Sequence, residues 1–344
     1  MPDPAFTRDG FAALLAAREP ARRPTVTAFA PISGGYSRLT AVAEVAWDDA
    51  SPERFVLRGD PPPDEGVFVS DRDSEWELLQ ALSRSRPVPT AAPRWYDGTG
   101  EHLGTKCIVA EHFPGRSLQD ALRDTDGQQH LSDLYLDVLA GVHRTPLDVL
   151  PASMERPPDW DAYVDGVLAG YAEVERELSD SNPVLRYVSA RLRADRPPPV
   201  PFALVHGDCQ PSNVLVTDTG EHVVIDWEFA RVGDPREDLG YYTQIPMEPN
   251  LYHRDPHAFL AGYRARTGLS EEQVDPRTVE YFLVLGIARL HTQILRALED
   301  VGRGRSRGVM ATYLINAVTH LDGMFFRIAR GLPSSALTPG VGPS

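Results

Sequence analysis

A short segment in the second half of the chain holds polar side chains that can act together. In His206-Gly207-Asp208-Cys209-Gln210-Pro211-Ser212-Asn213, a carboxylate and an amide stand five residues apart in a predicted loop. Thirteen residues after Asn213, a second carboxylate follows in Ile225-Asp226-Trp227-Glu228. Phosphoryl transfer needs a group that orients the attacking hydroxyl and accepts its proton, together with oxygen ligands for magnesium ions. The residues suit this reaction, with Asp208 as the base and with Asn213 and Asp226 as metal ligands.

A strand hairpin connects these groups. Val214 to Thr217 and His222 to Ile225 predict two short strands, joined by a turn at Asp218 to Gly220. One loop and one strand end can then supply all three functional groups. The alternative is that each aspartate only caps a turn or a helix, which is the common role of a single aspartate near a turn.

The same residues resemble the catalytic and metal-binding signatures of the aminoglycoside phosphotransferase and choline kinase-like families. The likeness continues through Gly233 to Tyr241, particularly toward the branch related to the kinase-like domains fused to acyl-CoA dehydrogenases. The resemblance implies an α+β, bilobal protein-kinase-like fold, with an N-terminal antiparallel sheet lobe that carries one key helix. The C-terminal lobe would be mainly helical, with an inserted catalytic hairpin. Asp238 would brace the catalytic loop from the following helix, and His206 would share this structural role.

The resemblance extends into the first part of the chain, where it implies a nucleotide site. Ile32-Ser33-Gly34-Gly35-Tyr36-Ser37 lies between two predicted strands, where these families have the loop that covers the nucleotide phosphates. The glycines, Gly34 and Gly35, would let the backbone approach the phosphates, and the hydroxyls of Ser33 and Ser37 would donate hydrogen bonds. An ordinary turn is the alternative.

Arg58 stands where these families carry a phosphate-binding lysine. It ends the segment Phe55-Val56-Leu57-Arg58, and arginine keeps the positive charge while gripping phosphate with two hydrogen bonds. Glu75 on the following helix is the expected ionic partner of Arg58. Lys106 is the only lysine in the chain, and we expect it to point into solvent at the start of the strand that leads to the hinge.

The segment Glu111-His112-Phe113-Pro114-Gly115 resembles the hinge of these families. Backbone groups of Glu111 and Phe113 would pair with the edge of the base, and this mode of binding needs no particular side chain. The sequence therefore does not separate ATP from GTP. ATP with Mg²⁺ is the default expectation, because it is the more frequent donor in the superfamily.

The acceptor site in this superfamily lies between the catalytic loop and the C-terminal helices. Carboxylates there would suit an amino sugar, and tyrosines would suit a flat or sugar-like ring. Roles in the core or in surface charge are the alternative. The candidate residues are Asp234, Glu237, Tyr241, Tyr242, Glu248 and Tyr252.

Two parts of the chain differ in hydrophobic periodicity. After a short helix around Phe11 to Ala17, the segment from Val26 to Glu111 predicts strands, and from Leu118 onward helical periodicity dominates. The expected strands are Thr40 to Trp47, Arg54 to Arg58 and Cys107 to Ala110, and the expected helices are Ser74 to Ser83, Leu131 to Val142, Asp159 to Leu178, Pro183 to Arg193, Pro256 to Thr267, Arg277 to Leu298 and Arg307 to Arg330. We predict a nucleotide phosphate-binding lobe over 1–111, a catalytic and acceptor-binding lobe over 112–332, and a disordered Pro-, Gly- and Ser-rich tail over 333–344.

Composition limits the kinds of partner. The 49 acidic residues outnumber the 34 basic ones, for a net charge of −15, and there is no long basic run, which disfavours a nucleic-acid backbone as the main ligand. Uncharged stretches are too short and too polar to cross a bilayer, and the N-terminus has no apolar signal core, so we expect a cytoplasmic protein without a membrane partner. In that setting Cys107 and Cys209 are expected to be free thiols.

Three functional hypotheses follow. The first is an O-phosphotransferase for a hydroxylated antibiotic or another natural product. The second is a kinase of a hydroxyacyl-CoA or another metabolite, which a basic groove would favour and the acidic balance disfavours. The third is a nucleotide-binding pseudokinase, because Arg58 departs from the usual lysine.

Overall fold

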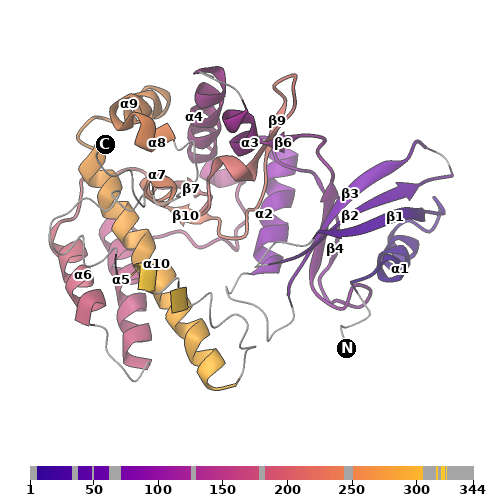
Figure 1. The fold of residues 1–344 in the computed structure, drawn as a ribbon, viewed down its shortest axis with the longest axis horizontal. Coiled ribbons are helices and arrows are strands. Elements are labelled where there is room, and N and C mark those ends of the chain that lie inside the picture. Colours follow the sequence, from indigo (N-terminus) through magenta and orange to yellow (C-terminus); the bar gives the residue numbers. More distant parts are fainter. Residues whose placement is uncertain are drawn as a thin grey trace, which may run out of the picture.

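The computed structural model describes residues 6–32, 38–48, 50–61, 71–124, 129–177, 183–243 and 251–304, and a few positions between 315 and 323. Figure 1 shows a sheet with helix α1 at one end of the molecule and a larger helical part at the other, with helix α2 between them. The helix expected over Arg307 to Arg330 lies largely outside the described residues, and the tail lies wholly outside them. Among the helices that the structure describes, none is long and apolar enough to span a bilayer.

The first part is built on a five-stranded antiparallel sheet with the strand order β1-β2-β3-β5-β4. Its central strands alternate buried and half-buried residues, so that Ala41, Ala43 and Val45 of β2 face a core shared with α1. Helix α2 begins at Asp71, whose carboxylate accepts the backbone N–H groups of Asp73 and Ser74. The elements are α1 (Arg8–Arg18), β1 (Thr25–Ile32), β2 (Leu39–Ala46), β3 (Glu53–Gly59), α2 (Arg72–Ser85), β4 (Pro93–Asp97) and β5 (Cys107–Glu111).

The second part is mainly helical and contains two small antiparallel sheets. Strands β6, β8 and β9 form one of them, and β7 pairs with β10 in the other. Long helix α10 begins with a capping box between Asp275 and Thr278, and its buried face packs on α5, α6 and α7. The elements are β6 (Arg116–Ser117), α3 (Leu118–Arg123), α4 (Gln129–His143), α5 (Trp160–Glu177), α6 (Pro183–Ala194), β7 (Ala203–Val205), β8 (Val214–Val216), β9 (His222–Val224), β10 (Arg231–Gly233), α7 (Arg236–Thr243), α8 (Leu251–Arg254), α9 (Pro256–Thr267) and α10 (Pro276–Gly302), with 3-10 turns at Leu147–Val149 and Pro211–Asn213.

This architecture confirms the expected sheet lobe with one key helix and the helical lobe with an inserted hairpin. Strands β4, β6, β7 and β10 were not predicted, and three of these four are only two or three residues long. Both cysteines are buried free thiols, as expected. The two parts are joined at residues 224–228, next to the candidate site, by bonds from Arg38, Arg58 and Thr90.

Candidate functional site

The catalytic-loop candidate Asp208 lies between β7 and β8, and its carboxylate is hydrogen-bonded on both oxygens. Gln210 Nε2 donates to Oδ1 at 2.8 Å, and Asn213 Nδ2 donates to Oδ2 at 2.8 Å. The side chain of Tyr241 on α7 also hydrogen-bonds to Asp208. Burial and then the charge of Asp226 raise the pKa of Asp208 to about 7, although the three hydrogen bonds oppose this shift. The carboxylate therefore changes charge near neutral pH.

Asp238 on α7 holds the loop from behind. Its fully buried carboxylate accepts the backbone N–H groups of His206 and Gly207, both at 2.8 Å, and lies 2.9 Å from His143 Nε2. Burial alone would raise the pKa of Asp238, but the hydrogen bond from His143 and the neighbouring imidazoles lower it. Gly207 has a φ of +84°, and a Cβ there would lie 2.6 Å from the carbonyl oxygen of Phe229. The structure thus confirms the bracing role expected for Asp238.

His206 connects the loop to the end of the hairpin. Its Nε2 lies 3.0 Å from the carbonyl oxygen of Ile225, and its ring packs against Trp227 with centroids 4.7 Å apart. Ile225 in turn donates its N–H to the carbonyl oxygen of Asn213 at 2.9 Å. These contacts bring Asp208, Asn213 and Asp226 into one place, as the spacing in the sequence predicted.

Asp226 sits in a left-handed turn, with a φ of +69° that a non-glycine residue rarely adopts. Arg58 at the end of β3 donates from Nη2 to Asp226 Oδ1 at 2.7 Å, and both side chains are about one-fifth exposed. Burial alone would lower the pKa of Arg58, but the charges of Asp226 and Glu75 raise it above its usual value. The arginine stays charged and holds the sheet to the hairpin.

Glu75 forms its direct ion pair with Arg72 and not with Arg58 as predicted, although the charge of Glu75 still raises the pKa of Arg58. The carboxylate of Glu75 is hydrogen-bonded by Arg72, three residues earlier on α2, and both side chains are buried. Arg72 is closer in sequence and lies on the same face of the helix, because residues three apart are neighbours in a helix. Arg58 therefore bonds Asp226, at the end of the hairpin in the second part of the chain.

Asn213 and Asp226 present oxygen atoms that suit magnesium. The amide nitrogen of Asn213 is used by the carbonyl and carboxylate of Asp208, at 2.9 and 2.8 Å, so the amide oxygen points away from this contact. Magnesium in kinases is bound by one or two protein oxygens, with water and the nucleotide phosphates as the remaining ligands. Within the described part of the chain, no group of three or more His, Cys, Asp or Glu residues could hold a metal by itself. The donor set fits an ion that arrives with a phosphate.

The remaining nucleotide-site candidates are only partly described. Ser33, Gly34, Gly35 and Ser37 lie outside the described residues. At the hinge, the N–H of Glu111 donates to Ala92, and the carbonyl of Phe113 accepts from Gly115. Lys106 is half-exposed and pairs with Asp73, which agrees with the expected position at the surface.

Two of the predicted acceptor residues are wrong, because they lie in the core. Asp234 is fully buried between Arg236, at 2.7 Å, and the indole N–H of Trp160, at 2.7 Å. Tyr242 is 1% exposed, and its hydroxyl accepts from Leu251. Because both side chains are buried and already hydrogen-bonded within the protein, neither is accessible to a substrate.

The other acceptor candidates differ in where they lie: beside Asp208, in the core, or outside the described residues. Tyr241 lies beside Asp208. Glu237 is buried, and although burial would raise its pKa, the charges of Arg231 and Arg289 and the hydrogen bond from Tyr163 lower it. Tyr252 is 9% exposed, and Glu248 lies outside the described residues.

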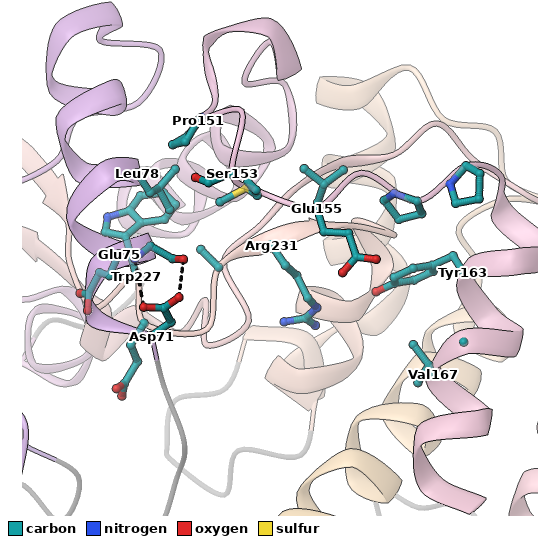
Figure 2. A pocket seen from close by; sticks show the side chains of 18 of the residues that line it. Asp71, Glu75, Leu78, Pro151, Ser153, Glu155, Tyr163, Val167, Trp227 and Arg231 are labelled. Atoms are coloured by element: carbon teal, nitrogen blue, oxygen red, sulfur yellow. Dashed lines mark hydrogen bonds between the residues drawn. The ribbon is translucent and has the colours of Figure 1, made fainter. Parts of the chain in front are cut away.

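A cavity of about 610 Å³ opens beside this centre, between α2 and α5. Figure 2 shows Glu75 and Trp227 at one end, Tyr163 and Val167 at the other, and Arg231 between them. A Cβ added at Gly207 would lie 2.8 Å from Arg231 Nη1, so one wall of the cavity reaches the residue before Asp208. Much of the lining is apolar, including Leu78, Met154, Pro157, Pro158, Val167 and Trp227.

Sequence reasoning missed a second set of charges next to Asp226. Arg38, which directly precedes β2, bonds Glu228 and Asp60, and Asp60 also accepts from Arg72. The only signal in the sequence is that these charged residues flank strands and helices of the first part. Nothing in their spacing shows that Arg38 and Glu228, 190 residues apart, would meet.

A sheet lobe and a helical lobe that meet where Asp208, Asn213 and Asp226 lie together have the architecture of kinase-like phosphotransferases. Residues 28–280 match the sequence profile described as the phosphotransferase enzyme family. The chain belongs to this family, and the resemblance deduced from its motifs is confirmed.

Individual proteins agree with this assignment. The chain is 29% identical over 211 residues to acyl-CoA dehydrogenase family member 11 of Gallus gallus, a match that covers 57% of this chain and 26% of that protein. The chain thus spans about a quarter of the length of the curated relatives it matches. The macrolide 2'-phosphotransferase MphH of Brachybacterium faecium has a similar fold, with a TM-score of 0.61 and 20% identity over 90% of this chain and 98% of that one. Choline kinase LicA of Streptococcus pneumoniae is similar at a TM-score of 0.58 and 14% identity, over 92% of this chain and 97% of that one, and LicA has also been solved with AMP.

The raised pKa of Asp208 predicts a pH-dependent effect on stability. The folded state binds the Asp208 proton more tightly than the unfolded state, so this residue lowers the free energy of unfolding as pH rises from about 4 to about 7. Asp208→Asn removes this contribution. Urea unfolding should therefore show the variant gaining stability over the wild type between pH 4.5 and pH 8. A stability difference that stays constant over this range would contradict the environment described for Asp208.

Proposed function

We propose that the chain transfers the γ-phosphoryl group of a nucleotide to a hydroxyl group of a small molecule. The observation that carries this proposal is the direct hydrogen bond between Asn213 and Asp208, with Asp226 close enough for its charge to raise the pKa of Asp208. A base, two metal-ligand oxygens and a cation on the facing strand are the protein groups that this reaction needs. The nucleotide is ATP, with GTP as the alternative donor.

In this mechanism Asp208 orients the acceptor hydroxyl and takes its proton. An ionised carboxylate has about four acceptor positions, and the donors to Asp208 in the described residues are Gln210, Asn213 and Tyr241. One position therefore remains for the substrate. A pKa of about 7 keeps a large fraction of Asp208 ionised at neutral pH while leaving it basic enough to accept a proton.

Asn213 and Asp226 would hold magnesium, which neutralises the phosphate oxygens when it is bound. Arg58 would then turn from Asp226 to the phosphates, because the metal takes the carboxylate that the arginine now holds. The N–H of Phe113 has no hydrogen-bond partner among the described residues, so it is available to the base of the nucleotide.

The acceptor would occupy the cavity between α2 and α5. Its volume of about 610 Å³ is typical of sites for drug-sized ligands. The mostly apolar lining, with Glu75 and Glu228 already paired to arginines, suits a hydroxylated molecule with a large apolar surface better than a polycation. An antibiotic or another natural product fits this description, in a role of resistance or self-protection.

A second candidate acceptor is a hydroxyacyl-CoA or a related metabolite. The match to acyl-CoA dehydrogenase family member 11 supports it. A panel of hydroxylated antibiotics and hydroxylated acyl thioesters, incubated with ATP or GTP and read by the mass gain of one phosphate, separates the two candidates.

The role of Asp208 predicts a large loss of turnover in Asp208→Ala. Because a general base contributes about 10²- to 10⁴-fold, the rate of nucleotide consumption should fall by a factor in this range, with little change in nucleotide affinity. Turnover is measured with magnesium, and affinity by calorimetry. A variant rate equal to that of the wild type would show that the chain is not an enzyme of this kind and would leave a nucleotide-binding pseudokinase.

Arg58 and Lys106 form a matched pair for the phosphate-binding role. Arg58→Ala should weaken nucleotide binding by about 10- to 100-fold, since a charge-assisted hydrogen bond is lost. Lys106→Ala should leave the affinity unchanged, because Lys106 pairs with Asp73 at the surface. Equal effects of the two variants on the dissociation constant would refute the replacement of lysine by Arg58.

Two glycines of α5 test the position of the acceptor. Gly166 lines the cavity and Gly170 does not, and a Cβ at either position meets no atom within 4 Å. Gly166→Trp should raise the KM for the acceptor at least about tenfold by filling the cavity, while nucleotide affinity stays the same. Gly170→Trp is the control for the helix itself. If both variants keep the wild-type KM, the acceptor binds elsewhere.

A further inference from the structure

Five charged side chains form a continuous series between α2 and the metal-binding turn. Glu75 is bonded by Arg72, Arg72 donates to Asp60 Oδ1 at 2.9 and 3.1 Å, and Arg38 donates to the same oxygen at 3.1 Å. Arg38 then reaches Glu228, two residues after Asp226. The series joins four segments of the chain: α2, the end of β3, the start of β2 and the end of the hairpin.

The last connection, from Arg38 to Glu228, has the geometry of a strong ion pair. Arg38 donates from Nε at 2.6 Å and also from Nη2 to Glu228 Oε2. The two side chains are only 5% and 3% exposed, so solvent screens the pair little. The pair therefore ties Glu228 to the segment that leads into β2.

The turn that Glu228 belongs to needs outside support. Asp226 is held at a φ of +69°, a left-handed conformation that costs free energy for non-glycine residues although aspartate adopts it more readily than most, so contacts of the turn help to keep it. Trp227 supplies one anchor, since its indole N–H donates to the carbonyl oxygen of Val224 and the hydroxyl of Thr90, both at 3.1 Å. The ion pairs of Asp226 with Arg58 and of Glu228 with Arg38 are two further anchors, and both come from the sheet.

A metal bound at Asp226 would compete with one of these two ion pairs and not with the other. Arg58 is bonded to the carboxylate of Asp226, the oxygen group that a metal would take. Arg38 is bonded to Glu228 and Asp60, so its contacts remain whether Asp226 holds an arginine or a metal. The connection from the sheet to the turn through Arg38 therefore does not use the carboxylate that would bind the metal.

We propose that Arg38 is a positioning residue for the metal site, and that it acts through Glu228 to keep Asp226 oriented toward the nucleotide phosphates. This inference rests on the proposed function, because it assumes that Asp226 binds magnesium together with a nucleotide. It assigns to Arg38 a connection between the sheet and the turn of Asp226 that does not use the carboxylate of Asp226 itself.

The test compares nucleotide affinity with and without magnesium. A non-hydrolysable ATP analogue is titrated by calorimetry into the full chain, in MgCl₂ and in EDTA, with a GTP analogue in a parallel series. Arg38→Gln should reduce the magnesium-dependent gain in affinity at least tenfold and leave the affinity in EDTA unchanged. Glu228→Gln should do the same, because it removes the other half of the ion pair.

The double variant Arg38→Gln, Glu228→Gln shows whether the two residues act together. If Arg38 works through Glu228, the double variant loses no more of the magnesium effect than either single variant. The double variant also leaves no buried unpaired charge, so it serves as the test protein if Arg38→Gln does not fold. Arg266→Gln is the matched control, since Arg266 also joins two carboxylates, Asp133 and Asp137, but on the helical part.

The outcomes are distinct. If Arg38→Gln weakens nucleotide affinity equally in MgCl₂ and in EDTA, Arg38 is a direct phosphate ligand. If the fold-losses of magnesium-dependent affinity in the two single variants multiply in the double variant, Arg38 acts independently of Glu228. Either result overturns the inference. A lower melting temperature with an unchanged magnesium effect would mean a merely structural role and would also overturn it. A wild-type protein without any magnesium effect would reject the proposed function, and this inference with it.

Discussion

The candidate site depends first on the carboxylate of Asp238, which accepts two consecutive backbone N–H groups of the catalytic loop in the core of the helical part. A buried carboxylate is costly unless its hydrogen-bonding capacity is used, and here His143 supplies the third contact. The bonds fix the peptide planes of His206 and Gly207, and with them the direction in which Asp208 leaves the backbone. A loop held in this way can present a base without rearranging during the reaction.

The second constraint is electrostatic, because carboxylates from both halves of the fold gather where a negatively charged nucleotide would bind. Arginines from the sheet and from α2 neutralise them in the structure: Arg58 pairs with Asp226, Arg38 with Glu228 and Asp60, and Arg72 with Asp60 and Glu75. These side chains are mostly buried, so removing one partner of a pair would leave an uncompensated buried charge, which is costly. Arg58 is the most exposed of the three arginines.

Much of this site could be predicted from the sequence, since Asp208, Asn213 and Asp226 are joined by a short loop and a hairpin whose local geometry brings them together. The bracing role of Asp238 was also predicted, because the family resemblance continues from the hairpin through Gly233 to Tyr241. The ion-pair partner of Glu75 could not be predicted, because Arg72 and Arg58 can both approach its carboxylate. Only the direction of helix α2 decides between them. Arg38 was missed because its partner is 190 residues away. Asp234 and Tyr242 were predicted to contact the acceptor, because their burial depends on how α7 packs against α10, which hydrophobic periodicity over eight residues does not determine.

The most direct measurement is a crystal structure with a non-hydrolysable nucleotide and Mn²⁺ in place of Mg²⁺, because the anomalous signal of manganese locates the ion without ambiguity. We expect an anomalous peak bonded to Asn213 Oδ1 and to the carboxylate of Asp226, with Asp208 still hydrogen-bonded to Asn213 and with Arg58 moved onto a phosphate oxygen. A nucleotide bound with no peak between Asn213 and Asp226, or with Asp208 directed away from the terminal phosphate, would contradict the account.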